Sequence, residues 1–201
     1  MAIASGALRG AALLEQILEV PVADRDAWID EALGGALEPP PDRPDLPRGA
    51  VPYLPCGVDA ILAMVRDVPV TRDDELVDLG SGLGRVAIIG HLLTGARARG
   101  IEIQDHLVAS ARARCAELGL HEVTFVHANA ADIELPGTVF FLYAPCNGAM
   151  LASLVDRLEA AARNRPIVVC TVDFELPDRP WLVPRASSCT SLTVYRSRVA
   201  T

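Results

Sequence analysis

One acidic residue and three glycines stand close together in the segment LVDLGSGLGRVA, residues 76–87. Asp78 lies near the end of an apolar run, Gly80, Gly82 and Gly84 follow at alternate positions, and a helical pattern then begins. Glycines allow a backbone to turn tightly and to approach a ligand, and the start of a helix attracts polar groups. The segment therefore predicts a loop that binds a small molecule, although a tight turn without a ligand could have the same composition.

The spacing of these glycines differs from that of a dinucleotide-binding loop. In the pattern G-x-G-x-x-G the last glycine follows two other residues, whereas here it comes one place early and Arg85 occupies its position. Asp78 would repel a pyrophosphate, but its charge suits a cationic amino group. An oxidoreductase with a nicotinamide cofactor is therefore the least favoured of three functional hypotheses.

The stretch VDLGSGLGR resembles the first motif of the class I S-adenosylmethionine (SAM) dependent methyltransferases. The resemblance continues at Glu102 in RGIEI, 24 positions after Asp78, and in FVHANAADI, residues 125–133, which is similar to the third motif of that family. The resemblance implies that SAM is the cofactor and that the residues holding it are Asp78, Gly80, Ser81, Gly82, Gly84, Glu102, Ile103, Asn129 and Ala130.

Two of these residues have a second interpretation. The resemblance implies that Glu102 accepts hydrogen bonds from both ribose hydroxyls, but a carboxylate at this position could instead cap the following helix. Asn129 stands where the family typically has an aspartate that reaches adenine. An amide oxygen can still accept a hydrogen bond from the adenine amino group, but Asn129 could also be only a turn residue.

Strand-like and helical segments alternate from residue 74 onward. Apolar runs suited to buried strands occur at 75–79, 98–103, 122–126, 138–143 and 167–172, and helical patterns occur at 84–93, 105–118 and 147–162. Two further strands, 181–185 and 192–196, have no helix between them and predict an antiparallel hairpin. The predicted fold class is α/β, a doubly wound, mostly parallel seven-stranded sheet with an antiparallel final hairpin and an N-terminal helical extension.

The strand order fits the family that the chain resembles, with one departure. That family usually has a helix between the fifth and sixth strands. The stretch DFELPDRP is too short and too rich in proline to form this helix.

The residues before the sheet divide into two parts. Helical spacing at 7–20 and 24–34 predicts a helical extension over 1–37, and prolines over 38–56 predict a strap without regular structure. A helix at about 57–67 opens the SAM-binding domain, predicted over 57–201. The extension could form a lid over the acceptor pocket or the contact of a homodimer.

The acceptor side is usually formed just after the fourth strand, where this chain has FFLYAPCNG, residues 140–148. The Asn/Asp-Pro-Pro-aromatic box of adenine and glutamine N-methyltransferases is missing there, and so are the acids of aminopropyl and catechol transferases. A looser similarity links the chain to seven-strand protein-lysine methyltransferases through Tyr53, Pro55, Tyr143, Val172, Phe174 and Pro177. It implies that Tyr53 closes over the cofactor and that Tyr143 is the candidate catalytic residue, whereas both tyrosines could instead only pack under loops.

Composition restricts the partners and the location. The chain of 201 residues has a net charge of −8, and all 18 basic residues are arginines, which disfavours a nucleic-acid partner. Its apolar runs are far shorter than the roughly 20 residues that span a bilayer. The N-terminus is more typical of an amphipathic helix than of a signal peptide, so we expect a cytoplasmic protein without membrane insertion. The five cysteines and four histidines have no metal-ligand spacing, so no metal site is expected.

These observations favour an enzyme that transfers a methyl group from SAM to a nitrogen or oxygen nucleophile of a small molecule or a protein side chain. The alternative is a non-catalytic module that binds SAM or acts as a scaffold. Two observations keep that alternative open, since no general base is evident and Asn129 departs from the family motif.

Overall fold

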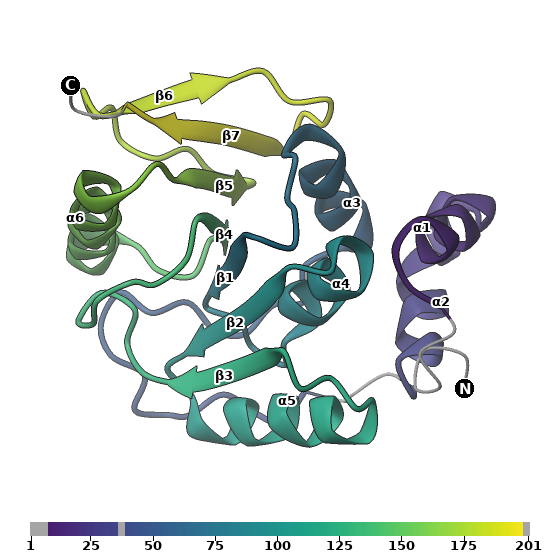
Figure 1. Cartoon of the computed structure of the whole chain (residues 1–201). Helices are drawn as coiled ribbons and strands as arrows, with labels where there is room; N and C mark the ends of the chain where they lie inside the picture. The colour runs from purple at the N-terminus through teal and green to yellow at the C-terminus, as the bar shows by residue number, and fades with distance from the viewer. Residues whose placement is uncertain (1–7, 36–38, 199–201) are drawn as a thin grey trace.

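The computed structural model describes residues 8–35 and 39–198. A seven-stranded sheet with the order β3-β2-β1-β4-β5-β7-β6 forms its centre (Figure 1). The strands are β1 (Glu75–Leu79), β2 (Arg97–Glu102), β3 (Val123–His127), β4 (Val139–Tyr143), β5 (Val168–Val172), β6 (Leu182–Arg185) and β7 (Leu192–Ser197). The first five strands are parallel, and β7 is antiparallel to both β5 and β6. The predicted fold class is confirmed.

Strand order reverses between β1 and β4. The chain moves outward from β1 to β2 and β3, then crosses back to place β4 on the other side of β1. In open α/β sheets, ligands bind at such a switch point, beyond the carboxyl ends of the strands. The loop after β1 and the residues after β4 both lie at this point.

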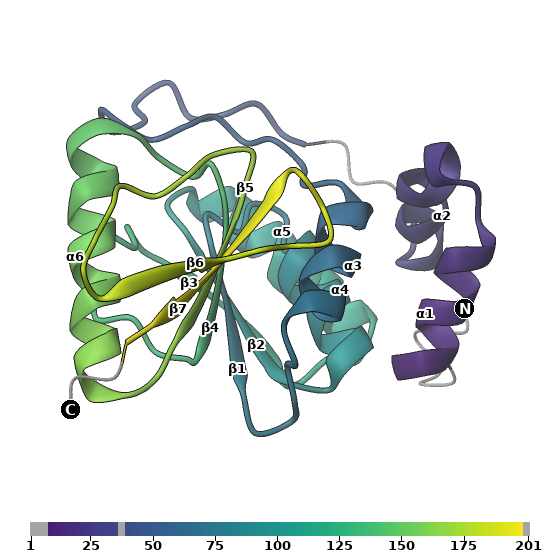
Figure 2. The same cartoon turned by 90° about the horizontal axis from the view of Figure 1, so that it is seen from above.

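Helices cover both faces of the sheet (Figure 2). They are α1 (Gly10–Glu19), α2 (Arg25–Ala32), α3 (Val58–Asp67), α4 (Arg85–Thr94), α5 (Asp105–Glu117) and α6 (Gly148–Asn164), with a short 3-10 helix at Val22–Asp24. The α6 helix lies on one face, and α3, α4 and α5 lie on the other. Successive strand residues enter opposite cores, since Leu76 packs on the α4 side and Val77 on the α6 side.

The segment bounds agree with the predicted ones to within a few residues. The β1 strand has the predicted bounds because an apolar run is ended there by the glycine loop. No helix lies between β5 and β6 in the described part of the chain, as the proline-rich sequence predicts. Residue 7 of the first predicted helix and residue 38 of the predicted strap lie outside the described residues.

The strap, described here over residues 39–56, holds no helix or strand. Its one bridge is antiparallel and pairs Ala50 with Cys146. Two further backbone hydrogen bonds, from Val51 N–H to Pro145 O and from Asn147 N–H to Gly49 O, fix the strap beside the start of α6. The strap therefore lies across the ligand-binding edge of the sheet.

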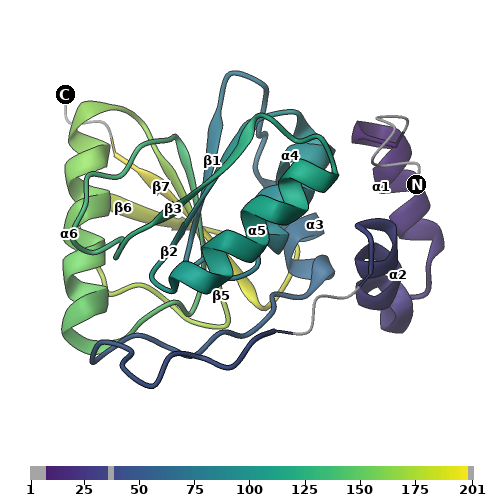
Figure 3. The same cartoon turned by 90° about the horizontal axis from the view of Figure 1, so that it is seen from below.

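The α1 and α2 helices form an outer layer on the α3–α5 side (Figure 3). The side chains of Leu13, Ile17 and Ile29 are fully buried there. Arg114 in α5 donates hydrogen bonds to the Leu33 and Gly35 carbonyl oxygens at the end of α2. The Leu33 carbonyl belongs to the C-cap of α2, at the negative end of the helix dipole, so a buried guanidinium stabilises the contact. Among the described helices, none is both long and apolar enough to cross a membrane.

Candidate functional site

The loop after β1 requires glycine at three positions. Gly80, Gly82 and Gly84 all have positive φ, at 83°, 51° and 85°. A Cβ at Gly82 would overlap the Tyr53 ring, and one at Gly84 would overlap the Phe125 ring. The backbone therefore has both the conformation and the close contacts that only glycine accepts.

A cavity of about 290 Å³ lies between this loop, the strap and the ends of the neighbouring strands. We call it the sheet-edge cavity. The predicted site residues that line it are Tyr53, Gly80, Glu102, Ile103, Asn129, Ala130 and Tyr143. Four predicted cofactor residues do not line it, namely Asp78, Ser81, Gly82 and Gly84. The Tyr53 ring, which lines the cavity, packs directly against Gly82.

Asp78 is a buried acid beneath the loop. Its side chain is 3% exposed, and burial together with the nearby charge of Glu102 raises the pKa of Asp78 to about 8. A carboxyl group in this position keeps its proton until a cation approaches it. Its environment therefore suits a ligand that carries a positive charge.

Glu102 at the end of β2 is oriented by two backbone donors. Its Oε2 accepts a hydrogen bond from Gly82 N–H, and its Oε1 accepts one from Gln104 N–H, each at 2.9 Å. Gln104 immediately precedes α5, so the capping interpretation describes one of these bonds. A carboxylate oxygen can accept a second hydrogen bond, so capping leaves acceptor capacity for a ligand hydroxyl.

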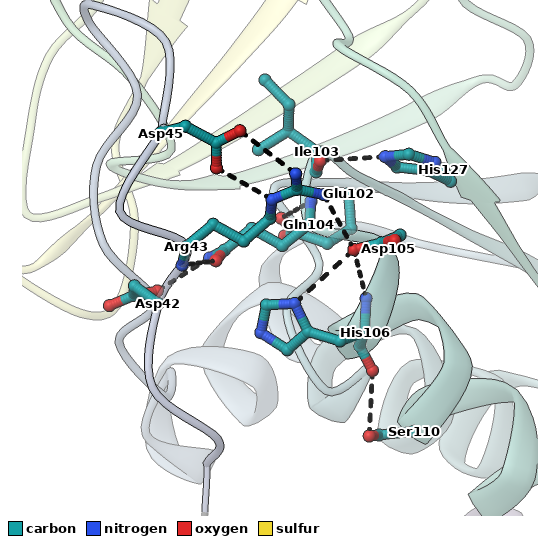
Figure 4. A network of polar contacts seen from close by, with 10 residues as sticks. All are labelled: Asp42, Arg43, Asp45, Glu102, Ile103, Gln104, Asp105, His106, Ser110 and His127. Carbon is teal, nitrogen blue, oxygen red and sulfur yellow. Dashed lines mark hydrogen bonds and ion pairs between the residues drawn. The ribbon is translucent and has the colours of Figure 1, made fainter.

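Gln104 itself holds the strap and was missed by the sequence analysis (Figure 4). Its Nε2 donates to Asp42 Oδ1 at 2.7 Å, and its Oε1 accepts from Arg43 N–H at 2.9 Å. The same Asp42 oxygen accepts from Tyr53 N–H at 2.9 Å. Gln104 is 2% exposed and lines the cavity, so its hydrogen bonds connect the start of α5 to the strap. The signal in the sequence was a polar residue directly after the predicted strand 98–103.

The side chain of Asn129 is engaged in a local turn. Its Nδ2 donates to Asp132 Oδ2 at 2.7 Å, and its Oδ1 accepts from Ala131 N–H at 3.1 Å. These contacts are those expected of a turn residue. Asn129 and Ala130 also line the cavity.

At the end of β3, the His127 ring lies 3.1 Å from the Ile103 carbonyl oxygen (Figure 4).

The far end of the cavity is formed where β4 and β5 end. Tyr143 pairs in register with Val172, and the next residue on each strand, Ala144 and Asp173, has a positive φ of 40° and 61°. Burial and the charge of Asp173 raise the pKa of the Tyr143 hydroxyl. The sequence analysis missed Asp173, although an acid directly after an apolar strand is a signal that was present.

The N-terminal helices contact the back of the glycine loop. The described residues of α1 and α2 do not line the sheet-edge cavity, which is covered by the strap. Arg85, the first residue of α4, donates to Asp26 Oδ1 at 2.7 Å, to Asp30 Oδ1 at 2.5 Å and to the Cys56 carbonyl oxygen at 3.0 Å. The predicted lid or dimer role of these helices stays a prediction.

Within the described chain, no group of three or more His, Cys, Asp or Glu is arranged to hold a metal ion.

Comparisons with known proteins bear on the family of the chain. No protein-family model and no curated protein sequence matches the chain. Among solved structures, an RNA methyltransferase from Salinibacter ruber in complex with S-adenosyl-L-homocysteine (SAH) is 30% identical, with 72% of this chain and 92% of that chain covered and a TM-score of 0.54. The candidate methyltransferase yhhF from Escherichia coli is 17% identical, with 75% and 91% covered and a TM-score of 0.59. A mutant of MtNAS in complex with SAM is 14% identical, with 71% and 63% covered and a TM-score of 0.58. The 30% identity over most of both chains, together with the seven-stranded sheet order and the glycine loop of this chain, leads to one conclusion: this chain belongs to the class I SAM-dependent methyltransferases.

Proposed function

We propose that the chain transfers a methyl group from SAM to a nitrogen or oxygen nucleophile of a small molecule or a protein side chain. One observation carries the proposal. A single cavity extends from Glu102 and Asn129, which the family resemblance assigns to the cofactor, to Tyr143 and Asp173 at the ends of β4 and β5. The cofactor end and a place for an acceptor are therefore continuous.

The residues present fit SAM. Asp78 lies outside the cavity lining, and its raised pKa would be lowered by a cationic amino group that reaches it after the Tyr53 ring has moved off Gly82. Glu102 has acceptor capacity for the ribose hydroxyls. The Asn129 amide oxygen, which accepts from Ala131 N–H, can accept a second hydrogen bond from the adenine amino group, with the Ala130 backbone beside it. When bound, SAM supplies a methyl group activated by its sulfonium charge.

The chain contributes positioning and exclusion of water. Tyr53 and the strap would cover the cofactor, while Tyr143 would orient the acceptor so that its lone pair points at the methyl carbon. Alignment of two reactants in a closed site lowers the barrier mainly through entropy, so a nucleophile that is already reactive needs no general base.

A methyl-release assay tests this proposal. Labelled SAM is incubated with the protein and with amines, phenols, carboxylates or protein mixtures, and transfer to any of them supports an enzyme. Binding of SAH without transfer to any acceptor would favour the non-catalytic module. Tight binding of NADH would instead revive the oxidoreductase.

RNA is the second acceptor class to be tested, because the Salinibacter ruber relative is an RNA methyltransferase. The net charge of −8 opposes general attraction to a phosphate backbone. Salt-dependent RNA binding followed by transfer of label to RNA would establish this candidate in place of the first.

A further inference from the structure

Two charged side chains line the sheet-edge cavity among the described residues, Glu102 and Asp173. Glu102 already accepts two backbone hydrogen bonds and belongs to the cofactor end. The Asp173 carboxylate forms no hydrogen bond or ion pair with the described residues, and only its backbone N–H is bonded, to the Ser191 carbonyl oxygen at 2.8 Å. One carboxylate at the acceptor end is thus available to a ligand.

The backbone at Asp173 is held in an unusual conformation. Its φ of 61° lies in the left-handed region, and Ala144, the residue directly after β4, has a φ of 40°. Such conformations cost free energy, and they concentrate at functional sites. Aspartate and asparagine tolerate this region better than most residues. The turn places Asp173 at the cavity beside Tyr143, since Tyr143 is in register with Val172.

The charges of the cavity indicate which acceptors it can take. No arginine or histidine lines it among the described residues, and the chain has no lysine. An acceptor that is an anion would therefore meet two carboxylates and no cation. An amine or ammonium group would find a charged hydrogen-bond acceptor and an aromatic ring, both of which favour it.

We infer that Asp173 binds the methyl acceptor and that the acceptor presents an amine or ammonium nitrogen. This inference rests on the proposed function and narrows it to N-methylation. The effect of Asp173 on the pKa of Tyr143 agrees with the closeness of the two side chains. An ammonium group first releases a proton to solvent, because only the neutral amine has a lone pair. The amine lone pair then forms a bond to the methyl carbon while the carbon–sulfur bond breaks and its electron pair stays on sulfur. The proton that the nitrogen loses passes to solvent, which Asp173 contacts because it is exposed.

Two variants test the role of Asp173. Asp173→Asn removes the charge but keeps a residue that tolerates positive φ. Asp178→Asn is the matched control, because Asp178 is an exposed acid of the same loop that does not line the cavity. Each protein is first titrated with SAH, then saturated with SAH and titrated with butylamine, butanol or butyrate by NMR.

We expect the wild type and the Asp178→Asn variant to prefer butylamine over both other probes. Asp173→Asn should bind butylamine about tenfold more weakly, because a hydrogen bond to a charged group is lost, while its SAH affinity stays the same. Preference for butanol or butyrate, or an equal loss in both variants, would overturn the inference. Failure of the wild type to bind SAH would count against the proposed function itself.

Discussion

Asp78 is a single residue whose surroundings disfavour its ionised form in the ligand-free protein. It is buried next to Glu102 on the neighbouring strand, and these surroundings raise its pKa from 3.8 to about 8. The sequence predicted a carboxylate that faces a cationic group. Only the structure reveals that the Tyr53 ring packs against Gly82 and that Asp78 does not line the cavity.

A pH dependence of stability follows from this burial. The folded protein keeps the Asp78 proton up to about pH 8, whereas the unfolded chain loses it near 3.8, so between these values the folded state binds more protons. The contribution of Asp78 to the free energy of unfolding is therefore greatest below 3.8 and declines as the pH rises towards about 8. Denaturant titrations of the SAH-free protein at about pH 5 and about pH 8 measure this decline, and Asp78→Asn should reduce it. An unchanged decline in the variant would refute the assignment.

At the scale of the elements, local sequence patterns predicted the strands of the sheet, but they did not predict the contacts that hold the strap over the cavity. The bounds of β1 and the missing helix after β5 were predictable because apolar runs, glycines and prolines act locally. The Gln104–Asp42 hydrogen bond joins residues 62 positions apart, and no periodicity marks such a partner. Asp173 was missed for a similar reason, since its significance depends on the neighbouring end of β4.

The strap should depend on Gln104. Gln104→Ala removes two partly buried hydrogen bonds, the one to Asp42 and the one from the Arg43 N–H, which should lower the free energy of unfolding by about 1–3 kcal/mol and speed proteolysis within residues 39–56. Arg43→Gln is the control, because its ion pairs with Asp45 and Asp105 are exposed and contribute little. Equal effects of the two substitutions would show that Gln104 does not anchor the strap.

At the scale of the whole molecule, the N-terminal helices and the cofactor loop are connected. Arg85 follows Gly84 directly and is paired with Asp26 and Asp30 of α2. The same guanidinium donates to the Cys56 carbonyl oxygen near the end of the strap. Helical spacing predicted α1 and α2, but it did not predict these ion pairs or the Arg114 hydrogen bonds, which join residues far apart in the sequence.

Two ion pairs of equal length allow this connection to be tested. Asp30 pairs with Arg85 at 2.5 Å and Asp59 pairs with Arg25 at 2.5 Å, but only the first reaches the loop. Asp30→Asn should weaken SAH binding about threefold or more, because the loop loses a support, whereas Asp59→Asn should leave SAH affinity unchanged. Calorimetry of both variants measures the difference. Identical SAH affinities would contradict a link between α2 and the cofactor loop.

The central claim is that the loop after β1 and Glu102 form a SAM site, and calorimetric titration with SAH tests it most directly. We expect the wild type to bind SAH and Glu102→Gln to bind it about tenfold more weakly, because hydrogen bonds to a charged acceptor are lost. Glu122→Gln, which changes an exposed acid just before β3, should bind like the wild type. Absence of SAH binding by the wild type, or equal binding by Glu102→Gln, would contradict the account.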